Sequence, residues 1–275
     1  MIHLLTALPC EAKPLIRHYR LRPLDSGSPL RLHANDRLRL AITGIGRDNM
    51  AAAVGYLQAS ATPREYPAWL NIGVAGHAHK PLGSPGLVHK VQDNRGSPCF
   101  YPPMLFETRL EGAELLTSDS PVTEYLGPHW YDMEGYAFFA QASRFSTLEL
   151  IHAIKIVSDN RHNPSERVNA ALVEELMAAQ LPAIDELLQQ LAELQQDHAA
   201  IIQEPTGLQR CLQQWHFSHY RKQRLQALLH RLQAMDEEIP WSQLADKTCA
   251  AEVLTTLEQH LARMDIVFQA ARSKA

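Results

Sequence analysis

Short apolar runs separated by turn residues recur through the first two thirds of the chain. Four of them predict buried strands, at residues 2–8, 37–43, 69–74 and 152–157. An alanine-rich stretch over residues 49–57 predicts a helix between the second and third strands. Strand–turn–helix order favours an α/β fold with helices packed on a sheet. The segment 77–110 is rich in Pro, Gly and Ser, so we expect loops and a hairpin there.

From about residue 184 the apolar positions follow helical spacing, and glycine nearly disappears. Three stretches show this spacing: Ile184, Leu187, Leu191, Leu194, His198 and Ile201; Leu225, Leu228, Leu229, Leu232 and Met235; and Leu254, Leu257, Leu261, Met264, Phe268 and Ala271. Stripes of this kind bury against another helix. We therefore predict two domains: an α/β domain over residues 1–203, with a mixed twisted sheet flanked by helices, and an all-α extension over residues 204–275.

The connection between the two domains is expected to be a long helix that starts near Ser165. Pro182 lies within it and should kink or end it, because proline lacks the N–H that a helix interior needs. An exposed apolar stripe would be an aggregation hazard or a binding site. We therefore expect the extension to dock on the α/β domain through this helix and to serve a structural or protein-binding role.

Composition narrows the class of protein. The net charge of −4 gives no electrostatic reason to expect nucleic acid or an acidic membrane as a partner, and no apolar run is long enough to span a bilayer. The aromatic and basic stretch 215–224 is expected to be an amphipathic helix, because residues 205–275 carry a near balance of acidic and basic side chains. The N-terminus lacks the basic and apolar regions of a signal peptide.

The cysteines and histidines predict no metal site and no disulfide framework. Cys10, Cys99, Cys211 and Cys249 are far apart in sequence and form no CxxC pair. The His77-Ala78-His79 pair has no evident third ligand. We expect a cytoplasmic protein without a cofactor.

Five motifs lie in order at the ends of the predicted strands. They are Ala7-Leu8-Pro9-Cys10-Glu11-Ala12, Thr43-Gly44-Ile45-Gly46, Gly73-Val74-Ala75-Gly76, Asp132-Met133-Glu134-Gly135 and Val157-Ser158-Asp159. The ordered set resembles the nucleoside phosphorylase/nucleosidase superfamily of purine nucleoside and uridine phosphorylases. It is most similar to the methylthioadenosine/S-adenosylhomocysteine nucleosidase branch. The resemblance covers about residues 1–195.

The resemblance implies cleavage of the N-glycosidic bond of a purine nucleoside, of adenine type and modified at the 5′ position. Asp159 would protonate the base and Glu11 would activate water, which is how two separated carboxyl groups cleave glycosidic bonds. Glu134 would bind the ribose hydroxyls, and Met133 would pack against the sugar. Gly46, Gly76 and Ser158 would complete the substrate site, since glycine permits close approach of the backbone.

Each of these residues also has an ordinary structural interpretation. Asp159 could belong to an Asx turn with Asn160, and Glu11 could be a first-turn glutamate favoured by the helix dipole. Glu134 could be a solvated residue of an amphipathic helix over residues 132–145.

Departures from the family pattern bear on the second substrate and on base recognition. Asn71 and Val74 stand where the phosphorylases carry phosphate ligands, which favours water over phosphate, although Arg47 could still supply a cation. Residues 118–121 lack the aromatic that stacks on the base, so stacking is expected from Phe100, Tyr101 or Tyr131. The alternatives are a phosphorylase and a degenerate nucleoside-binding or adaptor protein. We expect a homodimer, as is common in the superfamily.

Overall fold

The computed structural model describes residues 1–24, 27, 29–60, 67–202 and 204–272, with side chains omitted at 200–202 and 264–272. The chain divides into two compact units, Met1–Ala199 and Ala200–Ala275, which we call the α/β unit and the helical unit. The domain boundary predicted after residue 203 falls outside the described residues.

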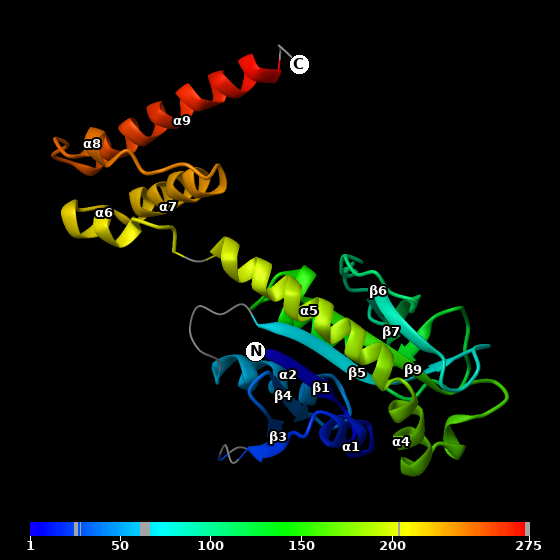
Figure 1. Cartoon of the computed structure of the whole chain (residues 1–275). Helices are drawn as coiled ribbons and strands as arrows, with labels where there is room; N and C mark the ends of the chain where they lie inside the picture. Colours follow the sequence, from blue (N-terminus) through cyan, green and yellow to red (C-terminus); the bar gives the residue numbers. More distant parts are fainter. Residues whose placement is uncertain (25–26, 28, 61–66, 203, 273–275) are drawn as a thin grey trace. The chain divides into compact units, whose positions relative to one another are not determined.

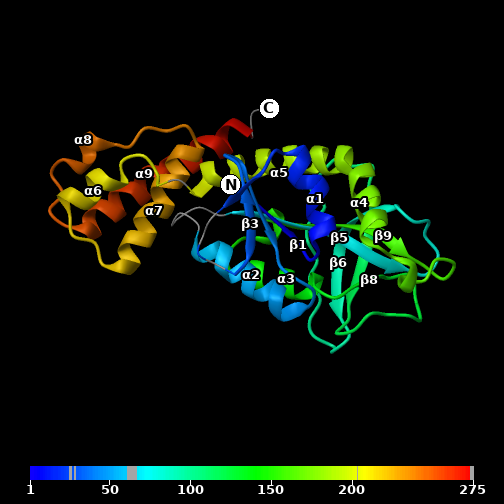
Figure 2. The same cartoon turned by 90° about the horizontal axis from the view of Figure 1, so that it is seen from below.

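A mixed nine-stranded sheet forms the centre of the described part of the α/β unit (Figures 1 and 2). Its strands are β1 (Ile2–Thr6), β2 (Arg22–Leu24), β3 (Arg31–Ala34), β4 (Leu38–Ile42), β5 (Ala68–His77), β6 (Pro85–Asp93), β7 (Glu111–Thr117), β8 (Trp130–Asp132) and β9 (Ile151–Asp159). Their order is β2-β3-β4-β1-β5-β8-β7-β6-β9, and β5 also pairs with β9. Strands β5, β8, β7, β6 and β9 therefore close into a ring. The predicted α/β fold is confirmed.

The four predicted strands are present as β1, β4, β5 and β9. They are parallel neighbours in the sheet, since β1 pairs with both β4 and β5, and β5 pairs with β9. Central parallel strands are buried on both faces, and this burial explains their continuous apolar runs. The prediction for segment 77–110 is wrong in part. The segment contains the long strand β6, which pairs with β7 and β9. The antiparallel pairing that a hairpin would need is limited to one isolated bridge, between Val91 and Phe100.

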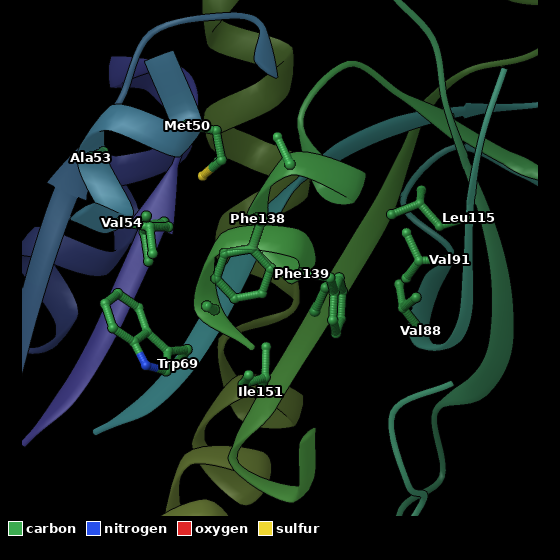
Figure 3. Close-up of a cluster of buried hydrophobic side chains, with 14 of the residues drawn as sticks. Met50, Ala53, Val54, Trp69, Val88, Val91, Leu115, Phe138, Phe139 and Ile151 are labelled. Atoms are coloured by element: carbon green, nitrogen blue, oxygen red, sulfur yellow. The ribbon is translucent and has the colours of Figure 1, made fainter. Parts of the chain in front are cut away.

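Helices cover both faces of the sheet. On one face, α2 (Arg47–Ala59) and α3 (Gly135–Ala142) pack on the strands, and Figure 3 shows Met50, Val54 and Phe138 in this core. On the other face, α1 (Pro9–His18), α4 (Ala170–Ala179) and α5 (Leu181–Ile202) contribute Leu15 and Met177, among others, to a second core. The alternation of side chains along β1 and β5 supplies apolar residues to both cores.

The region after β9 begins differently from the prediction. Ser165–Arg167 forms a single 3₁₀ turn, and the helix starts at Ala170, where the Asn169 side chain accepts a hydrogen bond from the Leu172 N–H. The prediction for Pro182 is confirmed: α4 ends at Ala179, and Pro182 lies in the first turn of α5. Proline is tolerated there because the first N–H groups of a helix have no intrahelical partner.

The helical unit consists, in its described part, of α6 (Leu208–Gln214), α7 (His219–Ala234), α8 (Trp241–Leu244) and α9 (Ala250–Arg272). Its core is apolar and contains Leu208, Cys211, Leu225, Leu229, Leu232, Leu244, Val253, Leu254, Leu257 and Leu261. Two of the three predicted stripes, those of α7 and α9, thus bury against each other. The first predicted stripe packs instead in the second core of the α/β unit, through Ile184, Leu187 and Leu191. The side chains of Met264, Phe268 and Ala271 lie outside the described ones. Among the helices that the structure describes, none combines the length and apolarity needed to cross a membrane.

Candidate functional site

A pocket of about 160 Å³ lies beyond the ends of β1, β5 and β9. Parallel strands point their carboxyl ends to the same edge of a sheet, and ligands of open α/β folds bind there. The loop after β4, the loop between β7 and β8, and the segment that joins β8 to α3 complete the wall. The lining residues are Ala7, Leu8, Glu11, Ile45, Val74, Ala75, Gly76, Ser120, Pro121, Val122, Tyr125, Tyr131, Asp132, Met133, Glu134, Ser158, Asp159 and Ser165.

Most of the residues singled out in the sequence meet at this pocket. Its walls include Glu11, Gly76, Met133, Glu134, Ser158 and Asp159. Gly46 is not part of the wall, but its backbone N–H donates a 2.6 Å hydrogen bond to Glu134 Oε1. Gly46 has a φ of 102°, a conformation that glycine adopts without strain, so the turn after β4 can present this N–H.

Glu11 is buried in the first turn of α1 and held by backbone N–H groups. Its Oε2 accepts hydrogen bonds of 2.8 Å from Ala7 and Leu8, and its Oε1 accepts one of 2.9 Å from Val74. A Cβ at Gly73 would lie 2.8 Å from Glu11 Oε1, so the adjacent strand must carry glycine there. Burial raises the pKa of Glu11, although the N–H groups of Val74 and Leu8 partly offset this shift. The result is a positioned carboxylate of increased basicity.

Glu134 precedes α3 directly and is only 7% exposed. The alternative interpretation placed a helix over residues 132–145, but β8 runs to Asp132 and α3 spans only Gly135–Ala142. The interpretation of Glu134 as a solvated helix residue is therefore wrong. Burial, and then the negative charge of Asp132, raise the pKa of Glu134 to about 7.

Lys155 supplies a buried positive charge that the sequence analysis missed. Its Nζ lies 2.8 Å from Asp132 Oδ2, and both side chains are almost fully enclosed. Asp132 also accepts hydrogen bonds from the Thr117 hydroxyl and the Gly135 N–H. Burial lowers the pKa of Lys155, but the charges of Asp132, Glu134 and Glu11 raise it more, so the net direction is upward. The sequence did contain an indication of this charge, since Lys155 interrupts the apolar run 152–157 of a predicted buried strand.

Asp159 is the last residue of β9 and is 8% exposed. Its Oδ1 accepts a 2.5 Å hydrogen bond from the Ser158 hydroxyl, and its Oδ2 accepts one from the Tyr125 hydroxyl. The Asx turn proposed as its alternative role is made by the next residue: Asn160 Oδ1 accepts hydrogen bonds from the N–H groups of His162 and Asn163. Asp159 therefore faces the pocket instead of capping the turn.

Tyr125 is a second pocket residue that the sequence analysis missed. Of the three aromatic residues expected to stack on the base, Tyr131 lines the pocket, whereas Phe100 and Tyr101 do not. Tyr125 lies beside Tyr131, with ring centroids 5.4 Å apart. Burial and the hydrogen bond to Asp159 raise the pKa of the Tyr125 hydroxyl, so it remains a proton donor at neutral pH. Tyr125 lies in a loop, where no periodic pattern in the sequence indicates which side chains face a pocket.

Arg47 and Asn71, which were considered in connection with phosphate binding, make hydrogen bonds to other parts of the protein. Arg47 donates to Asp119 Oδ1 at 2.7 Å, to the Thr117 carbonyl at 2.8 Å and to Asn94 Oδ1 at 3.1 Å. Asn71 is buried and donates to the Leu5 carbonyl at 3.1 Å. Among the described residues that line the pocket there is no Lys or Arg. The described residues also contain no cluster of three or more His, Cys, Asp or Glu suited to a metal ion.

The fold is similar to that of solved nucleosidases. MTAN of Chlamydia trachomatis, solved with adenine, is 21% identical over 70% of this chain and all of its own, with a TM-score of 0.51. The 5′-methylthioadenosine nucleosidase of Arabidopsis thaliana is 18% identical over 69% of this chain and 95% of its own, with a TM-score of 0.57. The futalosine hydrolase of Helicobacter pylori is 14% identical over 69% and 97%, with a TM-score of 0.54.

No family model and no curated protein matches the chain. The structural matches cover about the length of the α/β unit and nearly the whole of each matched chain. The resemblance that five short motifs indicated is thereby confirmed at the level of the fold: the α/β unit has the fold of the solved nucleosidases.

Proposed function

We propose that the α/β unit hydrolyses the N-glycosidic bond of a purine nucleoside, of adenine type and carrying a modified 5′ group. The observation that carries this proposal is the convergence of Glu11, Glu134 and Asp159 on one pocket, from three separate strand ends. Structural neighbours that are nucleosidases or a futalosine hydrolase support the reaction class. A pocket whose described lining lacks a Lys or Arg supports water, and not phosphate, as the second substrate.

Each carboxyl group has a task that its surroundings suit. Glu11 takes a proton from water, whose oxygen bonds to C1′ of the ribose as the C1′–N9 bond breaks. Asp159 acts as the general acid and transfers a proton to N7, so the base leaves as a neutral purine. Glu134 accepts hydrogen bonds from the ribose hydroxyls, and Met133 packs against the sugar. The products are a free purine and the free 5′-modified ribose.

The backbone around Glu11 supports its proposed role as the base. Three N–H groups fix the direction of its carboxylate, while burial raises its pKa. A fixed base of raised pKa accepts a proton more readily than a solvated glutamate and loses no orientation freedom in the reaction.

The test is incubation with a panel of purine nucleosides, with and without phosphate, followed by chromatographic detection of base and sugar. We expect free purine and free ribose at the same rate in both conditions. Formation of ribose 1-phosphate, with a strict need for phosphate, would replace hydrolysis by phosphorolysis. Absence of cleavage for every nucleoside, with binding retained, would instead leave a nucleoside-binding protein.

Three expectations from the sequence extend this proposal. A homodimer is expected from the behaviour of the superfamily, and light scattering at micromolar concentration tests it. A cytoplasmic location is expected from the cysteine pattern. For the helical unit we propose a structural or protein-binding role, because its described core is apolar and holds no carboxylate–histidine cluster.

A further inference from the structure

Tyr125 occupies space inside the proposed substrate pocket. A Cβ at Gly76 would lie 2.7 Å from the Tyr125 hydroxyl oxygen, 2.8 Å from Tyr125 Cε1 and 2.8 Å from Asp159 Oδ2. The hydroxyl end of the ring therefore lies directly over the backbone of Gly76 and next to the proposed acid. Gly76 is one of the positions at which close approach of the substrate is expected. The tyrosine thus stands in the region where the base would lie.

The size of the pocket supports this interpretation. The cavity of about 160 Å³ is smaller than the roughly 300–1,000 Å³ typical of small-molecule sites. A nucleoside with a 5′ substituent needs more room than the cavity offers. Rotation of the Tyr125 side chain away from Asp159 would enlarge it at the point where the base is expected.

The loop that carries Tyr125 is anchored before the residue and at the residue itself. At its beginning, Asp119 accepts a 2.7 Å hydrogen bond from Arg47 and bonds of 2.9 and 3.0 Å from Arg95. At Tyr125 itself, the backbone carbonyl accepts a 2.8 Å hydrogen bond from Arg161. These contacts hold the backbone. The Tyr125 ring is packed against Ala78 and Tyr131, so it would leave Asp159 by a change of its side-chain torsions and not by movement of the loop.

We propose that Tyr125 is a base-binding residue with two positions. In the free protein its hydroxyl binds Asp159 and fills the base site. On binding, the purine replaces the hydroxyl at Asp159, and the tyrosine ring packs against the base beside Tyr131. This inference rests on the proposed function, because it assumes that a purine binds at Asp159.

Two physical arguments favour this exchange over a tyrosine that stays at Asp159 and keeps the base out of the pocket. Asp159 is buried, and a buried carboxyl group that loses its partner must gain another. An adenine offers its 6-amino group as a donor for that purpose, next to N7, which accepts the proton in the proposed reaction. A planar base also gains from contact with an aromatic ring, and Tyr125 and Tyr131 are the aromatic residues of the described pocket lining.

Two variants separate the role of the hydroxyl from that of the ring. Tyr125→Phe keeps the ring but removes the bond that competes with the base. We expect KM to fall about tenfold, the scale of a hydrogen bond to a carboxylate, with kcat within about twofold. Tyr125→Leu keeps apolar volume beside Tyr131 but removes the ring face. We expect its KM to exceed that of Tyr125→Phe about tenfold.

Tyr19→Phe is the matched control. The Tyr19 hydroxyl also donates to an aspartate, Asp185 Oδ1 at 2.7 Å, but this bond lies outside the proposed site. We expect its KM and kcat to equal those of the wild type. Urea midpoints of all variants establish that each is folded.

Binding of free adenine, measured by calorimetry, gives a readout that does not depend on turnover. We expect tighter binding to Tyr125→Phe than to the wild type. If the wild type cleaves no nucleoside, the proposed function fails while the adenine Kd ratio still tests the exchange. A Tyr125→Phe variant with weaker binding, or with kcat reduced tenfold, would show that the hydroxyl acts in the complex and would overturn the proposal. Equal KM for Tyr125→Phe and Tyr125→Leu would overturn the ring contact.

Discussion

The two units differ in what they bury. In the α/β unit, Glu11, Asp132, Glu134, Lys155 and Asp159 are all enclosed at one edge of the sheet. In the described part of the helical unit, the buried side chains are apolar, with Cys211 the most polar of them. Both units have cores that stabilise them by removing apolar surface from water. The α/β unit also buries ionisable groups, and their removal from water opposes folding.

This difference indicates where the chemistry is. Burial of an ionised group costs several kcal/mol unless charges and hydrogen bonds compensate for it. A helical bundle such as α6–α9 avoids this cost by burying leucine against leucine. The α/β unit buries ionisable groups near its strand ends, despite this cost. Carboxyl groups with raised pKa values at such a place can exchange protons with a substrate. The predictions below test this division between a stabilising core and a reactive one.

The largest effect is expected from Asp159→Asn. The amide keeps the shape of the side chain and can still accept a hydrogen bond from Tyr125, but it cannot protonate the base. We expect kcat to fall by about 10²–10⁴, the usual contribution of general acid catalysis, with an unchanged unfolding midpoint. Steady-state kinetics on a cleaved nucleoside measure the effect. Asp36→Asn, in an exposed turn, is the control. Wild-type turnover in Asp159→Asn would remove Asp159 from the mechanism.

Lys155→Met tests whether the buried charges depend on one another. The change leaves Asp132 buried without its cation, beside Glu134 and Glu11. Loss of one partner of a buried ion pair costs about 3–5 kcal/mol in the free energy of unfolding, which urea denaturation measures.

Lys90→Met is the matched control for this prediction. Lys90 pairs with Glu114 at 3.0 Å, but both side chains are partly exposed. We expect a much smaller loss than for Lys155→Met, as for other surface ion pairs. Similar losses for the two variants would mean that the Lys155 site behaves as ordinary surface.

A smaller effect is expected from Glu134→Gln, and it depends on pH. The pKa of Glu134 is about 7. Ribose hydroxyls donate best to its ionised form, so the kcat/KM of the wild type should rise as pH increases through 7. Glu134→Gln should lack this rise and lose about 10- to 100-fold in kcat/KM at pH 8, the scale of a charge-assisted hydrogen bond.

The pH dependence of stability gives an independent check on Glu134. Stability should fall as pH rises, whereas kcat/KM should increase. Its folded pKa lies above the ordinary value of 4.5, so folding favours the protonated form. The stability that this preference contributes is complete below pH 4.5 and is lost as pH rises through 7. Urea midpoints of the wild type should therefore fall, relative to Glu134→Gln, between these values. Parallel curves would contradict the raised pKa. Glu174→Gln, at an exposed pair with Lys13, is the control.

The sequence predicted those parts of the fold that follow from local pattern. Strands β1, β5 and β9 are almost entirely buried and β4 is largely buried, so each of them shows a mainly apolar run. Strand β6 was missed because its partners β7 and β9 are distant in sequence and its own composition resembles a loop. The alternative interpretation of Glu134 started helix α3 too early, since β8 is only three residues long and leaves little local pattern.

The candidate site divides in the same way. Glu11, Glu134 and Asp159 were found because each belongs to a short motif at a strand end. Lys155 and Tyr125 were missed for physical reasons. The pairing of Lys155 with Asp132 joins residues 23 positions apart, and Tyr125 reaches Asp159 from a loop. Local spacing does not encode such contacts, because they form only when the folded sheet and its loops bring distant residues together.

The smallest effect on activity is expected from removal of the helical unit by truncation after Gln203. The shortened chain keeps all of α5, whose residues Ile184, Leu187 and Leu191 complete the core of the α/β unit. The helical core is built from residues 208–261 and shares no residue with the pocket. We therefore expect a soluble protein with kcat and KM within about twofold of the full chain, as for a change that acts independently of the site. Loss of solubility would show that the helical unit covers apolar surface of the α/β unit. A soluble protein with raised KM alone would show that the helical unit contributes to substrate binding, and the division between a stabilising and a reactive core would then fail.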